Sequence, residues 1–262
     1  MSTRILLVIL LVIPVMASAK DKVVPLPESA VAALSGKSFV VTRHDKAGFT
    51  AMTAGKAAFG LFGAGAMISA GNKIVADNAI GDPADILERE LAPAVAKQYG
   101  LQLKAGPSPV IKASKPKEIA ATQPDVDYVL DVESTGWMFA YYATDWDKYW
   151  VGYSAHVKFI ERASGKLIAD AFCNATTNKH AASPSKDSLL ENNAQLLKDV
   201  TTAQGWACVH VLAKEQFRLP DGVATPTPAE YADPLTAYAQ AKGSAVPATP
   251  AAAEAAAVPA AN

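Results

Sequence analysis

Two carboxylates in the segment VDYVLDVESTGW have the clearest potential for chemistry in this sequence. Asp131 and Glu133 are two residues apart, so on a β-strand they point to the same face, about 7 Å from each other. General acid–base pairs use such an arrangement. The solvated face of an ordinary strand has the same pattern, because apolar Tyr128, Leu130 and Val132 alternate with the acidic residues. We predict that both carboxylates lie on a solvated strand face.

Other polar residues give weaker indications of catalysis or metal binding. Asp145 and Asp147 supply only two loop carboxylates, whereas Ca²⁺ takes about 6–8 oxygen ligands. No serine lies in G-x-S-x-G and no H-E-x-x-H motif occurs. The histidines are scattered, at His44, His156, His180 and His210, and His156 is expected on an exposed strand face. We therefore predict a non-enzymatic protein without metal or cofactor, with a hydrolytic site assembled from distant residues as an alternative.

Aromatic residues are concentrated in residues 136–153, GWMFAYYATDWDKYWVGY, which hold three of the four tryptophans. The alternation of the second half of this segment directs Tyr149 and Tyr153 inward and places Trp150 on the opposite strand face. Exposed aromatic groups are typical of surfaces that bind protein, glycan or the membrane interface. We predict a binding surface around a hairpin tip, formed by Tyr141, Tyr142, Trp146 and Trp150. The alternative is that these rings fold back onto the sheet.

Residues 57–71, AAFGLFGAGAMISAG, contain no charged side chain. Their glycines follow G-x-x-G-x-G, which matches no nucleotide-binding pattern. Fifteen residues form about 22 Å of helix, less than the roughly 30 Å of bilayer hydrocarbon. We expect a core helix whose small residues let neighbouring backbones approach, with an interface between molecules as the alternative. The expected core contacts are Phe59, Leu61, Phe62, Met67 and Ile68.

The strand and helix signals predict an α+β fold. Strands are expected over residues 36–44, 101–104, 126–137, 149–161 and 166–173, the last two joined by the turn RASG. A short helix or turn is expected at 115–125. This order favours a mixed or antiparallel sheet of about four to five strands, with helices packed mainly on one face.

Two longer helices are predicted. The first covers residues 82–100, with Asp82 as N-cap, Gly100 at its end and a kink at Pro93, whose missing N–H breaks a helical hydrogen bond. The second covers most of residues 188–217. Its expected inward residues are Leu189, Leu196, Leu197, Val200, Ala207, Val211 and Leu212.

The two ends of the chain bound a single domain. Residues 1–19 combine Arg4, a twelve-residue apolar run and an Ala-Ser-Ala cleavage site, which predicts a cleaved signal peptide. Residues 220–262 contain 23 Pro or Ala among 43 residues, too few large apolar side chains to offset the ordering entropy. We predict one folded domain over residues 20–219 and a disordered Ala/Pro-rich tail, with Tyr231, Leu235 and Tyr238 as its plausible anchors.

The composition limits the classes of partner that we expect this protein to bind. The formal net charge is −1 and no basic stripe occurs, so nucleic-acid binding is not predicted. Export predicts a periplasmic location, with an extracellular one as second choice. An envelope protein is the expected partner, and contact with a membrane surface or a glycan is the alternative.

Three segments together carry a resemblance to a known group of proteins. They are VDYVLDVESTGW, YWVGYSAHVKFIERASGKLIADAFC and NKIVADNAIGDPADILERELA. They resemble uncharacterised periplasmic and lipoprotein-like envelope proteins of proteobacteria. The resemblance implies an accessory role in the envelope and brings no active-site residues. This chain has no lipobox cysteine after its cleavage site, which argues against a lipid anchor. The predicted function is therefore a non-enzymatic accessory or binding protein, with a lipid or glycan binder as the alternative.

The only two cysteines, Cys173 and Cys208, predict a disulfide, because an exported protein folds in an oxidising compartment. A metal pair or a catalytic thiol is the alternative. Closing the loop between them stabilises the fold by roughly 3–4 kcal/mol in the chain-entropy model. We expect thiol titration of the denatured, unreduced periplasmic protein to find no free thiol, and two free thiols would contradict the prediction.

Overall fold

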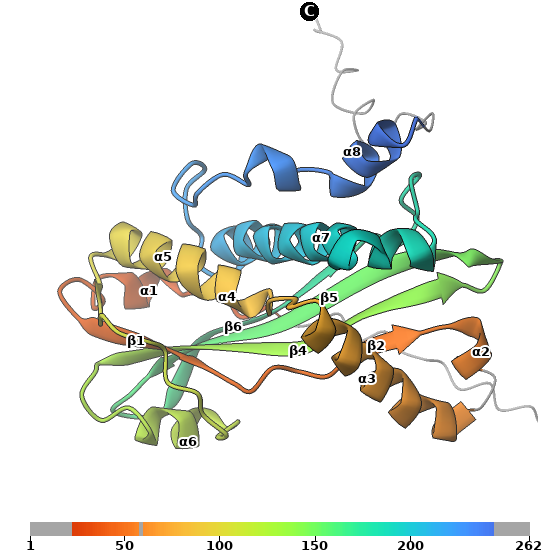
Figure 1. Cartoon of the computed structure of the whole chain (residues 1–262). Coiled ribbons are helices and arrows are strands. Elements are labelled where there is room, and N and C mark those ends of the chain that lie inside the picture. The colour runs from red at the N-terminus through yellow and green to blue at the C-terminus, as the bar shows by residue number, and fades with distance from the viewer. Residues whose placement is uncertain (1–22, 58–59, 244–262) are drawn as a thin grey trace, which may run out of the picture.

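A computed structural model describes residues 23–57 and 60–243, without the side chains of residues 56–62. The predicted signal peptide and the last part of the predicted tail, residues 244–262, lie outside the described residues. In the described chain, six strands form one mixed sheet in the order β3-β1-β4-β5-β6, with β2 also paired to β4 (Figure 1). The predicted α+β class is confirmed, and the sheet has six strands rather than four or five.

The first three strands are short and the last three form a long meander. Their bounds are β1 (Ser38–Arg43), β2 (Phe49–Met52), β3 (Gln102–Leu103), β4 (Tyr128–Tyr142), β5 (Asp145–Glu161) and β6 (Lys166–Thr176). β1 is parallel to β3 and β4, and β2 is parallel to β4. β5 is antiparallel to both β4 and β6. The β4–β5 hairpin is therefore the centre of the sheet.

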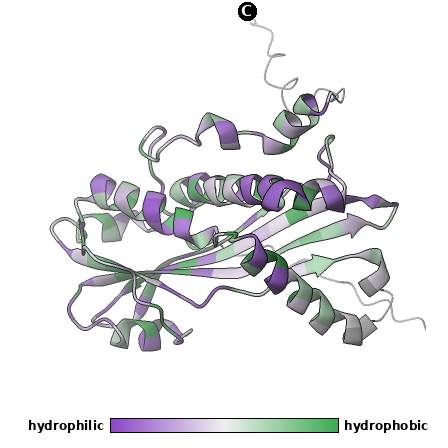
Figure 2. Cartoon of the chain, viewed as in Figure 1, coloured by the Kyte–Doolittle hydropathy of each residue, from purple (hydrophilic) through white to green (hydrophobic). Residues whose placement is uncertain are grey.

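The two faces of the sheet carry different cores, because successive side chains point to opposite faces. The first face packs under helix α7 (Lys186–Glu215) and carries the alternate residues Val151, Tyr153, Ala155, Val157 and Phe159 of β5. The second face carries a smaller cluster under α6 (Pro116–Ala121), in which Val129 and Ile160 contact Ile119. Figure 1 shows α7 and α6 on opposite sides of the sheet, and Figure 2 shows hydrophilic residues on the outer side of α7.

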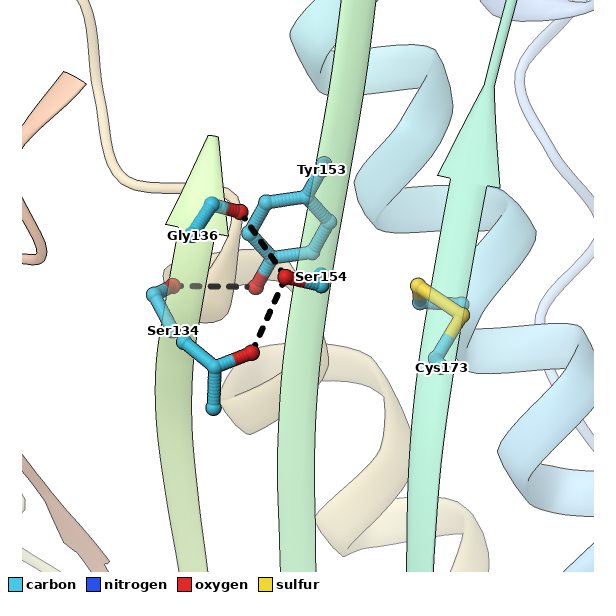
Figure 3. Close-up of a disulfide and its surroundings, with 7 residues drawn as sticks. Ser134, Gly136, Tyr153, Ser154 and Cys173 are labelled. Carbon is cyan, nitrogen blue, oxygen red and sulfur yellow. Dashed lines mark hydrogen bonds between the residues drawn. A yellow bond between two sulfur atoms is a disulfide. The ribbon is translucent and has the colours of Figure 1, made fainter. Parts of the chain in front are cut away.

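A break divides one edge of β4. β1 pairs with β4 up to Val132, and β2 pairs with it from Trp137 onward. Among the described strands, none pairs with this side of β4 over residues 133–136. A bulge in the β4–β5 ladder lies at the same place, between Ser134 and Gly136. Figure 3 shows how hydroxyl groups tie the bulge to β5: Ser134 meets the Tyr153 hydroxyl at 3.0 Å, and Ser154 donates to the Gly136 carbonyl at 3.2 Å.

The helix predicted at residues 82–100 consists of α4 (Ala84–Ile86), a π-helical turn (Leu87–Leu91) and α5 (Ala92–Tyr99). A carboxylate oxygen of Asp82 accepts a hydrogen bond from the Ala84 N–H at 3.0 Å, and Gly100 ends the helix with φ of 64°. The π turn directly precedes Pro93, where the helix lacks one N–H donor. A kink is predicted at Pro93, and the structure has a π-helical turn just before it.

Helix α7 is joined to β6 by the predicted disulfide. Cys173 and Cys208 are bonded, with their Cα atoms 5.5 Å apart, and both side chains are buried. Cys173 of this bridge lies beside β5 in Figure 3. The bond fixes Cys208 toward the sheet and thereby fixes the rotation of the helix.

The expected burial of α7 is correct for most positions and wrong for two. Leu189, Leu196, Leu197, Val200 and Leu212 are buried. Ala207 is exposed and Val211 is 45% exposed. Successive helical residues are rotated by about 100° around the helix axis. When Cys208 points toward β6, Ala207 and Val211 therefore lie on the flank of α7 rather than against the sheet.

The small-residue segment forms most of α3 (Gly60–Asp77), which follows the short α2 (Ala54–Ala57). Met67 is buried as expected, but Ile68 is 42% exposed, because it lies on the flank of α3 away from the core. Phe59, Leu61 and Phe62 fall outside the described side chains. Figure 2 shows α3 as largely apolar until its hydrophilic C-terminal end. No helix among the described residues is long and apolar enough to cross a membrane.

The closest approach of α3 to the sheet occurs at Gly71. A Cβ atom placed there would lie 1.9 Å from the carbonyl oxygen of Phe49 in β2. The Asn72 side chain accepts a hydrogen bond from the Phe49 N–H at 2.9 Å. The small residues therefore let this helix lie directly against a strand backbone.

The first and last described segments pack on the same side as α7. The N-terminal segment contains α1 (Glu28–Val31) and buries Leu26 and Leu34. The C-terminal segment contains a 3₁₀ turn (Ala229–Tyr231) and α8 (Pro234–Ala241), whose Leu235 is 2% exposed. Tyr231 and Tyr238 also pack against the main core. The described structure thus includes helical segments C-terminal to residue 219.

We predict that Gly71→Ala destabilises the protein by about 1–3 kcal/mol, because the added methyl group overlaps the Phe49 carbonyl and the backbones must separate. Chemical denaturation followed by circular dichroism measures this change.

The matched control is Gly65→Ala in the same helix, where a Cβ meets no atom within 4 Å. It should be neutral or stabilising by up to about 1 kcal/mol, since alanine favours the helix. Equal effects of the two substitutions would contradict the close approach at Gly71.

Candidate functional site

A buried ionic cluster lies on the second face of the sheet. Asp131 is 0% exposed. One of its carboxylate oxygens accepts a hydrogen bond from Thr42 Oγ1 at 2.8 Å and lies 2.9 Å from His44 Nε2. The other accepts a hydrogen bond from Lys158 Nζ at 3.0 Å. The prediction that Asp131 lies on a solvated face is therefore wrong, because three strands and the segment after β1 enclose it.

Lys158 joins the second carboxylate to this cluster. Its ammonium nitrogen lies 3.3 Å from Glu133 Oε2, and the residue is only 6% exposed. Strand register produces this arrangement, because Asp131 pairs directly with Lys158 on β5 and with Thr42 on β1. His44 follows the end of β1 and closes the cluster at the break in the β4 edge.

The charges of the cluster shift the pKa of two members. The hydrogen bond with Asp131 raises the pKa of His44 above 6.5, and this outweighs the opposite effect of burial. Burial alone raises the pKa of Asp131, but the hydrogen bond with His44 and the charge of Lys158 bring it below its ordinary value. When His44 is protonated, the cluster contains two cations, His44 and Lys158, and two carboxylates, so its net charge is zero.

The cluster contains three groups able to ligate a metal. The ligand atoms of His44, Asp131 and Glu133 all lie within 4.8 Å of one another. The Lys158 ammonium, however, lies between the two carboxylates at hydrogen-bond distance from both. A divalent ion there would be repelled by this ammonium and would have to displace it. The geometry thus fits an internal ion network better than a metal site.

A second histidine–carboxylate pair adjoins the cluster. His156 Nε2 lies 2.5 Å from Asp170 on β6, and its ring stacks on Phe172 with the centroids 3.8 Å apart. The His156 side chain is 16% exposed, so the expectation of an exposed histidine is wrong. Its neighbours on β6 were not identifiable from the sequence, because they depend on the hairpin register.

The structure separates the four aromatic residues predicted to form one binding surface. Tyr141 is half-buried and packs against the main core, and Trp150 lies on the second face, where its ring covers Gly152. Trp146, at the hairpin tip, is 66% exposed. The Tyr142 hydroxyl meets Ser183 at 3.1 Å and accepts a hydrogen bond from the Lys179 N–H at 2.9 Å. Tyr142 and Trp146 are thus near the tip but face different surroundings.

A cavity of about 810 Å³ lies beside the hairpin tip, between the loop after β6, the start of α7, and α8. Tyr142, Asp145 and Lys148 line its hairpin side. A smaller groove of about 350 Å³ is lined in part by Trp150. Asp145 and Asp147 are exposed, and in the described residues they join no group of three potential metal ligands.

The comparisons with solved structures give weak resemblances to bacterial proteins, one of which is named as a lipoprotein. No protein-family model and no curated protein sequence matches the chain. The PelC dodecamer of Paraburkholderia phytofirmans is similar with a TM-score of 0.31 and 14% identity, covering 76% of this chain and 97% of that one. Lipoprotein GNA1162 of Neisseria meningitidis is similar with a TM-score of 0.27 and 12% identity, covering 53% of this chain and 82% of that one. The LpoB C-terminal domain of Escherichia coli is similar with a TM-score of 0.20 and 12% identity, covering 56% of this chain and 93% of that one. Scores this low assign no function to this chain.

The raised pKa of His44 makes stability depend on pH. The folded protein holds this proton more tightly than the unfolded chain, so the stabilisation is complete below about pH 6.5 and is lost as pH rises through the raised pKa. The lowered pKa of Asp131 acts in the opposite sense: its stabilisation is present above about pH 4 and is lost at lower pH. We predict that the unfolding free energy of the wild type falls between pH 6 and 9 (roughly the range in which histidines titrate) more than that of His44→Gln.

The control for this comparison is His210→Gln, because His210 Nε2 faces the hydroxyl of Thr227 rather than a carboxylate. Denaturation curves at several pH values should give parallel profiles for this variant and the wild type. Parallel profiles for His44→Gln and the wild type would contradict the role of the His44 proton.

Proposed function

We propose that this protein is a non-enzymatic accessory protein of the bacterial cell envelope, exported to the periplasm, which binds a partner protein through the tip of the β4–β5 hairpin. The observation that carries the proposal is the indole of Trp146, which is 66% exposed at that tip. The disulfide between Cys173 and Cys208 fits an oxidising compartment.

The surroundings of Trp146 have the composition of a small docking surface. Its only hydrogen bond within the described chain runs from the indole N–H to the Ala143 carbonyl, at 3.1 Å, so the ring itself remains available. Its sequence neighbours Asp145, Asp147 and Lys148 are exposed as well. Tryptophan is enriched among the residues that dominate binding energy, and a polar rim around such an anchor is typical of protein interfaces.

The ionic cluster supports a structural rather than a catalytic role. A general acid or base must reach a proton on the substrate, but Asp131 is 0% exposed and Lys158 is 6% exposed. Their charged atoms are bonded to each other and to His44, Thr42 and Glu133. Breaking such a buried pair typically costs about 3–5 kcal/mol, which is consistent with a cluster that specifies strand register.

One observation favours a glycan as the alternative ligand. The ring of Trp150 lies along the sheet over Gly152, where a Cβ would approach its Cζ3 atom to 2.8 Å. The groove beside it is also lined by the hydroxyl residues Thr50, Thr135, Ser154 and Thr176. A flat indole among hydroxyl groups suits the apolar face and the hydroxyl groups of a sugar ring.

We predict that Trp146→Ala weakens capture of the partner by about 2 kcal/mol or more, because a dominant anchor is removed. Its unfolding free energy should change by less than about 0.5 kcal/mol, as expected for a surface position. In-cell cross-linking followed by quantitative mass spectrometry, with thermal unfolding of the purified variants, measures both.

Val211→Ala is the matched control, since Val211 is an exposed apolar residue near the C-terminal end of α7, whereas only the start of this helix adjoins the hairpin tip. It should retain every cross-linked partner. Retention of the same partners by Trp146→Ala would reject the docking surface, as would a large loss of stability in that variant.

A further inference from the structure

The walls of the 810 Å³ cavity are held in place by contacts between separate segments. On α8, Tyr238 donates a hydrogen bond to Glu191 at 2.6 Å, and Lys242 forms an ion pair with the same carboxylate at 2.9 Å. Asp233, which precedes α8, pairs with His180 at 3.2 Å. These contacts attach α8 both to α7 and to the loop after β6. The cavity is therefore built by tertiary structure, and its volume falls within the roughly 300–1,000 Å³ of ligand sites.

The charges on the cavity wall leave an excess of positive charge. Lys242 is neutralised by Glu191, and His180 faces Asp233. Lys148 and Lys179 also line the cavity, are exposed, and form no ion pair within the described chain. Asp145 is the remaining carboxylate on this wall. Two ammonium groups against one carboxylate favour an anionic ligand.

The uncharged part of the wall is polar. Tyr142, Ser183, Ser185 and Ser188 line the cavity. Their hydroxyl groups already bond one another and the backbone, but a hydroxyl offers one donor and two acceptor positions, so each can make a further contact. The apolar side chains on the wall are small: Ala181, Ala182, Pro184 and Ala239. An acyl chain would find little apolar surface here, whereas a ligand with several hydroxyl groups would find partners.

We propose that this cavity binds a small anionic, polyhydroxylated ligand: an acidic sugar or a sugar phosphate whose charged group lies between Lys148 and Lys179. The cavity shares Asp145 and Lys148 with the rim of the docking surface, but Trp146 itself is not among the residues lining the cavity. Carboxylate and phosphate share the chemistry that the two lysines recognise, and hydroxyl groups of the sugar pair with the serine-rich wall.

Titration calorimetry of the full mature protein tests the site with four probes: galacturonate, glucose 6-phosphate, glucose and inorganic phosphate. We expect binding of at least one of the two acidic sugars, weaker binding at high salt, and no binding of glucose. The stronger of the two identifies the anionic group. Binding of inorganic phosphate as tight as that of the sugar phosphate would overturn the recognition of hydroxyl groups, and absence of binding by both acidic sugars would overturn the site.

Variants locate the binding within the molecule. The double substitution Lys148→Gln with Lys179→Asn should weaken binding by about tenfold or more, because both charge-assisted contacts are lost. Asparagine is chosen because Lys179 has φ of 68°, which asparagine tolerates. Ala239→Phe should also abolish binding, because it fills the cavity without changing its charge.

Lys166→Gln is the control, since Lys166 is an exposed lysine at the start of β6 and does not line the cavity. It should bind like the wild type. Unchanged binding in the double variant or in Ala239→Phe would place the ligand elsewhere and reject the proposal. Trp146→Ala should bind the acidic sugar normally, so failure of partner docking and failure of this site remain distinguishable.

Discussion

The pairing of β4 with β5 is the constraint on which the other features of the structure depend. The ladder fixes which residues face α7 and which face the opposite side, and a shift by one residue would exchange the two faces. The ladder aligns Asp131 with Lys158, so that the two form an ion pair. Each charge alone would be costly to bury in the protein interior. The same ladder carries Tyr142 and Trp146 to the far end of the sheet. Core, ionic cluster and hairpin tip are thus three consequences of one register.

Much of this architecture could be predicted from local sequence signals. The helix around Pro93 was identifiable because Asp82 and Gly100 mark its ends: Gly100 ends it as expected, and Asp82 accepts a hydrogen bond from the first turn although Pro83 takes the N-cap position. The strands could be assigned because apolar and polar residues alternate over residues 130–133 of β4 and 153–159 of β5. The disulfide followed from there being only two cysteines in a chain with a predicted signal peptide. Each of these inferences uses residues that are close in sequence or unique in the chain.

The ionic cluster could not be predicted by the same reasoning. An acidic residue at every second position is compatible with solvent and equally with a buried partner, and the alternation alone does not distinguish them. The partner of Asp131 on β5 is 27 residues away, and its partners Thr42 on β1 and His44 just after it are almost 90 residues away. A buried lysine among the polar positions of β5 is the signal in hindsight, but only the strand order shows what it faces. The rotation of α7 was misjudged at Ala207 and Val211 for a related reason, since it is fixed by a cross-link rather than by the helix alone.

The break between β1 and β2 along β4 has a consequence for cooperativity. β2 is attached to the sheet through four residue pairs, Phe49 to Met52, and to α3 through Gly71 and Asn72. No ladder of the described strands connects β2 with β1, so the two pieces on this edge share no continuous hydrogen bonding. Native proteins open in contiguous units whose free energies differ. We expect β2 and α3 to form one such unit, which opens and closes as a whole while the β4–β5–β6 meander, cross-linked to α7, stays folded.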